Sequence, residues 1–131
     1  MKTPIKTLLA ILFVSLLSSP SWSAGISFDD LVERDGLIYK KFTDVPFTGE
    51  VDEGLMQGSF KNGKVEGPWV RYYDNGQLAA KGGFKNSRKE GPWVEHWKNG
   101  QLGQTGVYKN NKKEGFWEYF HDNGQFLYFG T

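Results

Sequence analysis

Histidine and cysteine, two of the main ligands of zinc in proteins, are scarce or absent in this sequence. The only histidines are His96 and His121, and the chain has no cysteine. Structural and catalytic zinc sites need three or four protein ligands. The strand pattern of the chain places the two histidines on opposite faces of a sheet, so the sequence predicts no metal site and no cofactor.

Three glutamates, Glu66, Glu90 and Glu114, recur at a spacing of 24 residues. Hydrolysis of glycosides uses two carboxylates about 5–9.5 Å apart in unequal environments. Equivalent residues two strands apart would lie about 9–10 Å apart in similar surroundings, which does not suit an acid and base pair. The chain also has no nucleophile-elbow or phosphate-loop pattern. We therefore expect a protein that is not an enzyme.

Basic residues gather in three segments between predicted strands, and these segments would stack along one edge of a sheet. The eight residues are Lys61, Lys64, Lys85, Arg88, Lys89, Lys109, Lys112 and Lys113. One interpretation is a row of solvated turns. The other is a surface for an anionic partner, which would be lipid headgroups, lipopolysaccharide phosphates or an acidic protein.

A 24-residue repeat must position these side chains. A tryptophan, an Asn-Gly pair and a glycine recur in phase three times, and internal periods of this length are typical of repeat proteins. The recurring residues are Trp69, Trp93 and Trp117; Asn75, Gly76, Asn99, Gly100, Asn123 and Gly124; and Gly82, Gly106 and Gly130.

Each repeat is predicted to be a β-hairpin. Asn-Gly between apolar runs favours a two-residue type I′ turn, in which both residues have positive φ. If Asn75 and Gly76 are the loop, Tyr73 faces Leu78 and Trp69 faces Gly82, and the same count pairs the tryptophan and glycine of the next two repeats. A large ring can cover the hole that a glycine leaves across the ladder.

Alternation along the strands sorts the side chains onto two faces. One face carries Trp69, Tyr73, Leu78 and Phe84 with their equivalents in later repeats, and we expect it to be the packed face. The other face carries Val70, Tyr72, Ala79 and Lys81 with their equivalents. In the alternative interpretation the tryptophan row is exposed and stacks on sugar rings, as in a glycan- or cell-wall-binding repeat protein.

The unit G-P-W-x-x-Y-Y-x-N-G-Q-L-x-x-x-G-x-F-K-N resembles the bacterial MORN-variant repeat (membrane occupation and recognition nexus). The resemblance covers residues 56–131, and residues 31–51 look like the degenerate leading unit of antitoxin-like members of that family. It implies an all-β fold, a single-layer antiparallel meander of repeated β-hairpins, and a role in docking to membranes or proteins without a catalytic site. An antitoxin- or immunity-like component is a further alternative.

The first 23 residues have the pattern of a cleaved secretory signal peptide. Lys2 and Lys6 precede the apolar stretch 7–17, and a cut after Ser23 leaves small residues at the −3 and −1 positions. We therefore expect a periplasmic or secreted protein, and the lack of cysteine excludes a lipoprotein anchor. Residues 24–55 would form an N-terminal cap and the leading repeat, with a helical turn in residues 26–33 capped by Ser27.

Export also bears on the class of partner. The chain has 16 basic and 15 acidic residues, and two of the lysines lie in the predicted signal peptide, which leaves a net charge of −1. Nucleic acid is not expected as a partner for an exported chain of this charge. Charge is unevenly placed, because residues 24–58 hold eight acidic and three basic residues, whereas residues 59–131 hold seven acidic and eleven basic ones.

The apolar segment Phe126–Gly130 is predicted to form a strand with one unpaired edge, which could accept another strand. One interpretation is a homodimer formed edge to edge through this segment. The other is a monomer in which Tyr128 and Phe129 pack back on Trp117 and Phe120.

Overall fold

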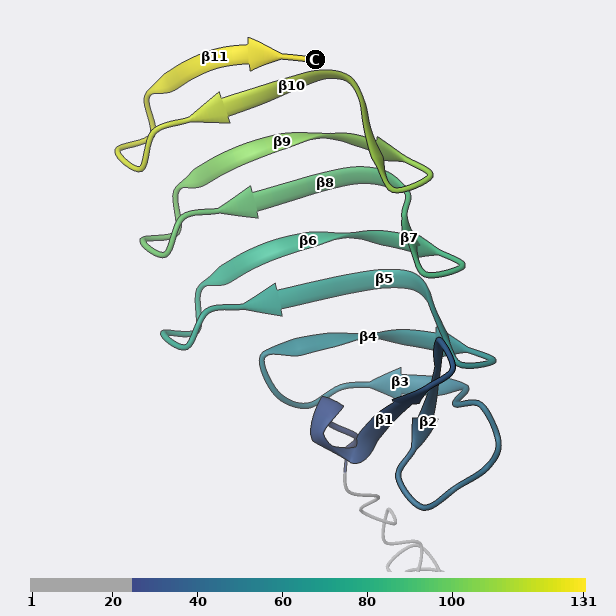
Figure 1. The fold of residues 1–131 in the computed structure, drawn as a ribbon. Coiled ribbons are helices and arrows are strands. Elements are labelled where there is room, and N and C mark those ends of the chain that lie inside the picture. The colour runs from purple at the N-terminus through teal and green to yellow at the C-terminus, as the bar shows by residue number, and fades with distance from the viewer. Residues whose placement is uncertain (1–24) are drawn as a thin grey trace, which may run out of the picture.

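The structure, a computed structural model, describes residues 25–131. The predicted signal peptide, residues 1–23, lies outside the described residues. Across the described part of the chain, no helix is long and apolar enough to span a membrane. The predicted all-β class is confirmed, because the chain forms an antiparallel meander of hairpins that rises from the N-terminal segment to the last strand (Figure 1).

Two sheets make up the fold. A small sheet pairs β1 (Leu31–Arg34) with β2 (Leu37–Lys40). The nine-stranded sheet runs in sequence order, with β7 beside β6. Its strands are β3 (Gly49–Val51), β4 (Met56–Lys61), β5 (Lys64–Tyr72), β6 (Leu78–Lys85), β7 (Arg88–Lys89), β8 (Gly91–His96), β9 (Leu102–Lys109), β10 (Lys112–Phe120) and β11 (Phe126–Gly130).

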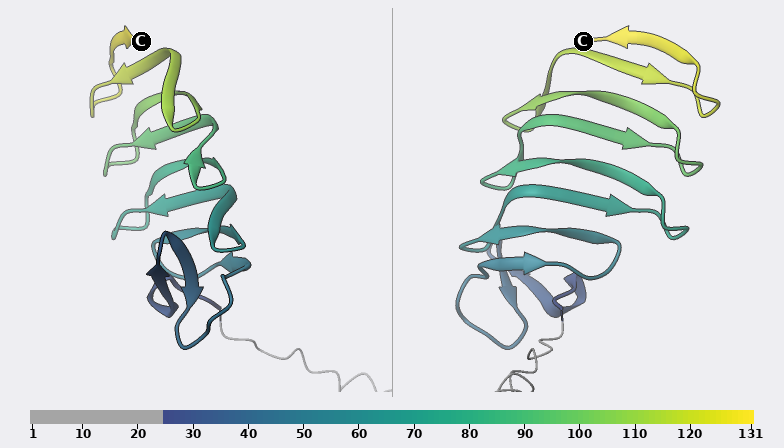
Figure 2. Two further views of the ribbon diagram at one scale, coloured as in Figure 1. Left: turned by 45° about the vertical axis from the view of Figure 1, so that its right-hand side comes forward. Right: turned by 180° about the vertical axis from the view of Figure 1, so that it is seen from behind.

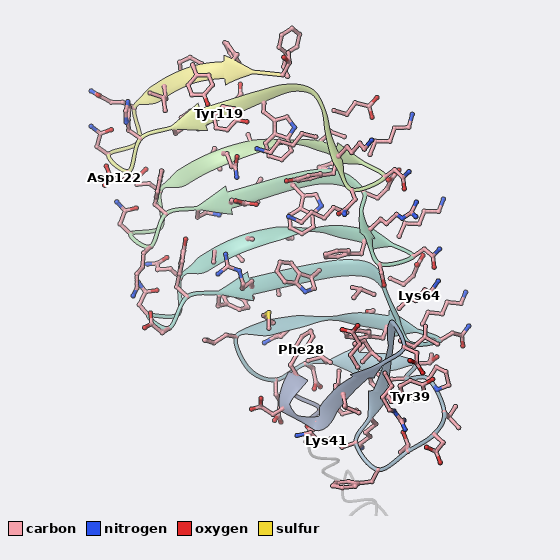
Figure 3. All side chains as sticks on the ribbon, in the orientation of Figure 1. Phe28, Tyr39, Lys41, Lys64, Tyr119 and Asp122 are labelled. Atoms are coloured by element: carbon pink, nitrogen blue, oxygen red, sulfur yellow. The ribbon has the colours of Figure 1, made fainter. Side chains whose placement is uncertain are left out.

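The N-terminal segment closes the first end of the large sheet. A 3-10 turn, Phe28–Asp30, is capped by Ser27, whose hydroxyl accepts a hydrogen bond from the Asp29 amide at 3.1 Å. The predicted turn is therefore present but short, because β1 begins at Leu31. Phe28 packs edge-on against the buried Phe60 of β4, with ring centroids 5.8 Å apart (Figure 3).

The type I′ turns do not lie at the Asn-Gly pairs, where they were predicted. The basic segments hold the two-residue type I′ turns, 62–63, 86–87 and 110–111, and both residues of each turn have positive φ. The Asn-Gly segments instead form three-residue loops. In the first of these, Gly76 donates a hydrogen bond to the Tyr73 carbonyl and only Gly76 has positive φ. This is a type I turn followed by a left-handed glycine.

A β-bulge restores the predicted tryptophan–glycine register. Tyr72 pairs with Leu78, and the register then shifts by one residue, so that Trp69 faces Gly82 as predicted. Trp93 faces Gly106 and Trp117 faces Gly130 in the same way. The extra loop residue and the bulge cancel each other.

The bulge also corrects the predicted faces of the sheet. Because Leu78 pairs with Tyr72 rather than Tyr73, its side chain lies on the face opposite Trp69. Leu102, which pairs with His96, follows the same rule. We call the face that carries Trp69, Trp93 and Trp117 the tryptophan face.

The rings do not cover the glycines that the sequence suggested. Each tryptophan leans back over the glycine of the preceding strand, so a Cβ atom on Gly82 would overlap the Trp93 ring and one on Gly106 would overlap the Trp117 ring. Trp93 and Trp117 are 1% and 0% exposed. The rows thus form one continuous aromatic core, in which Trp93 lies 5.6 Å from Trp69 by ring centroids.

Candidate functional site

Two of the three recurring glutamates join one repeat to the next. The carboxylate of Glu66 accepts a hydrogen bond from the Asn86 amide, and that of Glu90 accepts one from the Asn110 amide, both at 2.7 Å. These bonds fix the second and third type I′ turns to the hairpins before them. The carboxylates therefore have a structural use, which explains why they recur at the period of the repeat.

The three type I′ turns stack along one edge of the sheet, and the Asn-Gly loops stack along the opposite edge (Figure 1, Figure 2). In Figure 3, Lys64 marks the first edge and Asp122 the second. Arg88 binds across the first edge to the next turn, because its guanidinium donates a hydrogen bond to the Asn110 side-chain oxygen at 2.7 Å.

Six basic residues flank these turns, and we call them the basic edge. They are Lys61, Lys64, Lys85, Arg88, Lys109 and Lys112. They face each other across the ladder as three like-charged pairs, Lys61 with Lys64, Lys85 with Arg88, and Lys109 with Lys112. All are exposed except Lys64, which is half-buried.

Like charges directly opposite each other in a sheet destabilise it. Within residues 25–131, the salt bridges are Arg34 with Asp44 and Lys98 with Asp74, and neither involves the basic edge. The fold therefore holds six cations on one edge without pairing them to carboxylates. A row of like charges that no salt bridge compensates is typical of a functional surface.

Two of the eight predicted basic residues lie elsewhere. The ammonium of Lys89 lies 4.4 Å from the Trp93 ring centroid and 4.8 Å from that of Tyr108. Lys113 lies 4.3 Å from the centroid of Trp117. Both lysines thus cover the aromatic core through cation–π contacts. Burial, the main cause, raises the pKa of the Tyr108 hydroxyl above its usual value, so this ring stays neutral beside the lysines.

The Asn-Gly edge is held by its own ladder of bonds. The Asn75 side chain accepts a hydrogen bond from the Gln77 amide and donates one to the Lys98 carbonyl of the next loop. Asn99 repeats this arrangement with Gln101 and Asp122. These contacts explain the asparagines of the repeat as structural residues.

A salt bridge crosses the same edge between consecutive loops. The Lys98 ammonium lies 3.0 Å from the Asp74 carboxylate. Its hydrogen bond and charge lower the pKa of that carboxyl below the usual range. Both groups are largely exposed, so the pair is a weak one.

The histidines do not meet. His96 ends β8 beside Leu102, and its buried Nδ1 has no hydrogen-bond partner, whereas His121 is exposed in the last loop. Over residues 25–131, no three His, Asp or Glu side chains are gathered as metal ligands would be.

The tryptophan row is core rather than a platform for sugars, since Trp93 and Trp117 are buried. Among residues 25–131, the exposed tryptophan is Trp97, at 44%. Beside it lies a groove on the tryptophan face that the sequence analysis did not predict. Its lining residues include Glu95, Gln104, Tyr119 and Tyr128. The available signal was that these positions differ between repeats, while the structural positions are alike.

The comparison with known families agrees with this geometry. Residues 65–86 match the family model described as MORN repeat variant. No curated protein matches the chain. The matched MORN segment covers most of β5, the Asn-Gly loop and all of β6, which together form one hairpin with its tryptophan and glycine.

The hairpins β8–β9 and β10–β11 repeat the register of this matched hairpin. Strand β11 pairs with β10 on one side, and its segment Phe126–Gly130 has no second partner strand among residues 25–131. Its aromatic side chains contact their own hairpin: Phe126 lies 5.7 Å from Phe120, and Tyr128 lies 4.6 Å from Tyr119, by ring centroids. Pairing of two copies through this edge stays a prediction.

Proposed function

We propose that this chain is an exported, non-enzymatic docking module that binds an anionic lipid surface of the cell envelope through its basic edge. A MORN-type hairpin is in keeping with a repeat-based binding role. The observation that carries the proposal is the row of like-charged pairs with no carboxylate partner within the described part of the chain. Each basic side chain near an anionic membrane contributes about 1 kcal/mol.

The geometry suits a surface rather than a small ligand. The turns project from one edge in a line, so their side chains can reach a plane of phosphates at the same time (Figure 1). A shallow hollow of about 290 Å³ lies between the second and third turns, lined by three cations, Lys85, Arg88 and Lys109, and by Glu90, whose carboxylate is bonded to the Asn110 amide. Such a line of charge also attracts an acidic protein, and the experiment below separates the two partners.

Reversing the charge of Lys85, Arg88, Lys109 and Lys112 to glutamate is expected to abolish binding to vesicles. The loss of four cations near the surface corresponds to at least about a thousandfold in affinity. The measurement is co-sedimentation of residues 24–131 with vesicles that contain phosphatidylglycerol. Binding of the parent protein should weaken as salt is raised, because ions screen exposed charges.

A matched control reverses four exposed lysines that lie away from this edge, Lys40, Lys41, Lys81 and Lys98. It changes the net charge equally and should keep most of the binding. If the parent protein ignores the vesicles at low salt, the lipid surface is wrong and an acidic protein becomes the partner to seek. Equal loss in both variants would show that net charge, not the basic edge, attracts the vesicles.

Export is part of the proposal and rests on the pattern of Lys2, the apolar stretch 7–17 and Ser23. When the full chain is produced in a Gram-negative host, we expect the protein to appear in the periplasm with Ala24 as its first residue. N-terminal sequencing after fractionation checks this. A cytoplasmic product that begins at Met1 would contradict it.

A further inference from the structure

Two rows of side chains run across the tryptophan face. The first is the structural row of tryptophans and glycines. The second row lies two residues after the tryptophan in β5, β8 and β10, and two residues before the glycine in β6, β9 and β11. Cross-strand pairing fixes its order from β5 to β11. Its members are Arg71, Ala80, Glu95, Gln104, Tyr119 and Tyr128. Figure 3 shows Tyr119 near the last of these strands.

Four residues on this face form one hydrogen-bonded network. Gln104 donates from its side-chain nitrogen to the Glu95 carboxylate at 2.6 Å. The ammonium of Lys113 donates to the Gln104 side-chain oxygen at 2.9 Å and to the Tyr119 hydroxyl at 3.1 Å. The network contains one negative and one positive charge, so it is neutral as a whole. Each member is held in place by another.

Aromatic rings wall the groove beside this network. The Trp97 indole nitrogen donates to the Phe120 carbonyl at 3.0 Å, and the edge of the ring lies over Gly103. Tyr119 and Tyr128 stack with centroids 4.6 Å apart and planes 13° apart. The groove has a volume of about 370 Å³, within the range of small-ligand sites.

The network is not needed to build the repeat. One repeat earlier, Arg71 stands where Glu95 does, and Ala80 stands where Gln104 does. One repeat later, the same positions hold Tyr119 and Tyr128. The hairpins nevertheless have the same register, so these side chains are free to differ. A half-buried polar network in only one repeat therefore calls for a use other than stacking.

We propose that this groove binds a neutral carbohydrate, with a sugar ring against Trp97 and its hydroxyls on Glu95, Gln104 and Tyr119. The Glu95 carboxylate of the groove would repel an anionic ligand. The Lys113 ammonium, which is bonded to Gln104 and Tyr119 of the lining, would repel a cationic one. A sugar has an apolar face of C–H groups for the indole and paired hydroxyls that both donate and accept. The Glu95 carboxylate can accept further hydrogen bonds, and the Tyr119 hydroxyl can donate one.

The test is calorimetric titration of residues 24–131 with three neutral tetrasaccharides: cellotetraose, maltotetraose and chitotetraose in its N-acetylated form. At least one of them should bind, and Trp97→Ala and Glu95→Ala should each weaken that binding about tenfold or more. Phe116→Ala is the matched control, because Phe116 is an exposed ring (77%) next to Trp117 in the strand and so lies on the opposite face. This control should bind as the parent does.

Two further measurements separate loss of sugar binding from loss of folding and from failure of the lipid proposal. Far-ultraviolet circular dichroism checks that Glu95→Ala still folds, and the exposed Trp97 offers a second variant if it does not. The four-residue reversal of the basic edge should leave sugar binding unchanged, so this inference and the lipid proposal can fail separately. Absence of binding by all three sugars, equal binding by Trp97→Ala, or displacement of the sugar by tetramethylammonium would overturn the proposal.

Discussion

Replacing Trp93 with alanine is expected to lower the free energy of unfolding by about 3–5 kcal/mol, the usual cost of removing a buried large ring. Trp93 is 1% exposed and contacts the rings of Trp69, Phe84 and Tyr108, with centroids 5.5–5.7 Å away. Its indole nitrogen also donates to the Gly83 carbonyl at 3.2 Å. Alanine would leave a cavity between two repeats. Denaturation in urea measures the change.

Trp97→Ala is the natural comparison for Trp93→Ala. Trp97 lies four residues away in the same repeat but is 44% exposed, so its removal should cost less than half as much. If the two variants lowered the urea midpoint of unfolding equally, the buried position of Trp93 would not govern stability.

Replacing Gly82 with alanine is the second large effect that we expect. The added Cβ atom would overlap the Trp93 ring, so the ring or the strand must move. Overpacking of this kind costs about 1–3 kcal/mol. Lys81→Ala, an exposed neighbour on the same strand, should change stability by no more than about 0.5 kcal/mol.

A variant that combines Gly82→Ala with Trp93→Ala tests how the added methyl group destabilises the fold. If the methyl group acts by displacing the ring, Gly82→Ala should cost little once Trp93 is already alanine, and the double variant should be more stable than the sum of the two single changes predicts. Full additivity in the urea midpoints would show that glycine is needed at Gly82 for another reason, such as its backbone conformation.

Much of the fold could be predicted from the sequence because the repeat supplies the same information three times. The pairing of Trp93 with Gly106 required only a count from the loop. That count was right although the turn was wrong, because the three-residue loop and the bulge compensate. An Asn-Gly pair favours a type I′ turn, but Asn75 instead uses its side chain to bind Gln77 and the next loop, which settles the local geometry.

The basic edge was predicted in part. Lys85 and Arg88 lie where the turn pattern put them, but Lys89 and Lys113 lie over the aromatic core. A signal was present in the sequence, since Val65 holds the equivalent position in the first repeat and packs against the cluster of Phe60. A position that accepts valine in one repeat is facing the packed side in the others.

The groove could not be predicted from single strands. Glu95 and Gln104 pair in the register that the count from the loop gives for Trp93 and Gly106. Tyr119 meets Gln104 only because a bulge shifts the register between β9 and β10. A shift of one residue would turn any of these side chains to the other face. Sequence alternation alone does not settle the bulges, so the meeting of these three groups is visible only in three dimensions.

The backward lean of the tryptophans gives the stack a direction of growth. Trp69 lies over Gly58, Trp93 over Gly82 and Trp117 over Gly106, so each hairpin finishes the core of the one made before it. Each earlier hairpin is complete except for a gap above its glycine, and the segment that follows it in the sequence carries the ring that fills this gap. Chains are made and fold from the N-terminus. The N-terminal segment thus acts as a template, on which assembly can proceed one hairpin at a time in the order of the sequence.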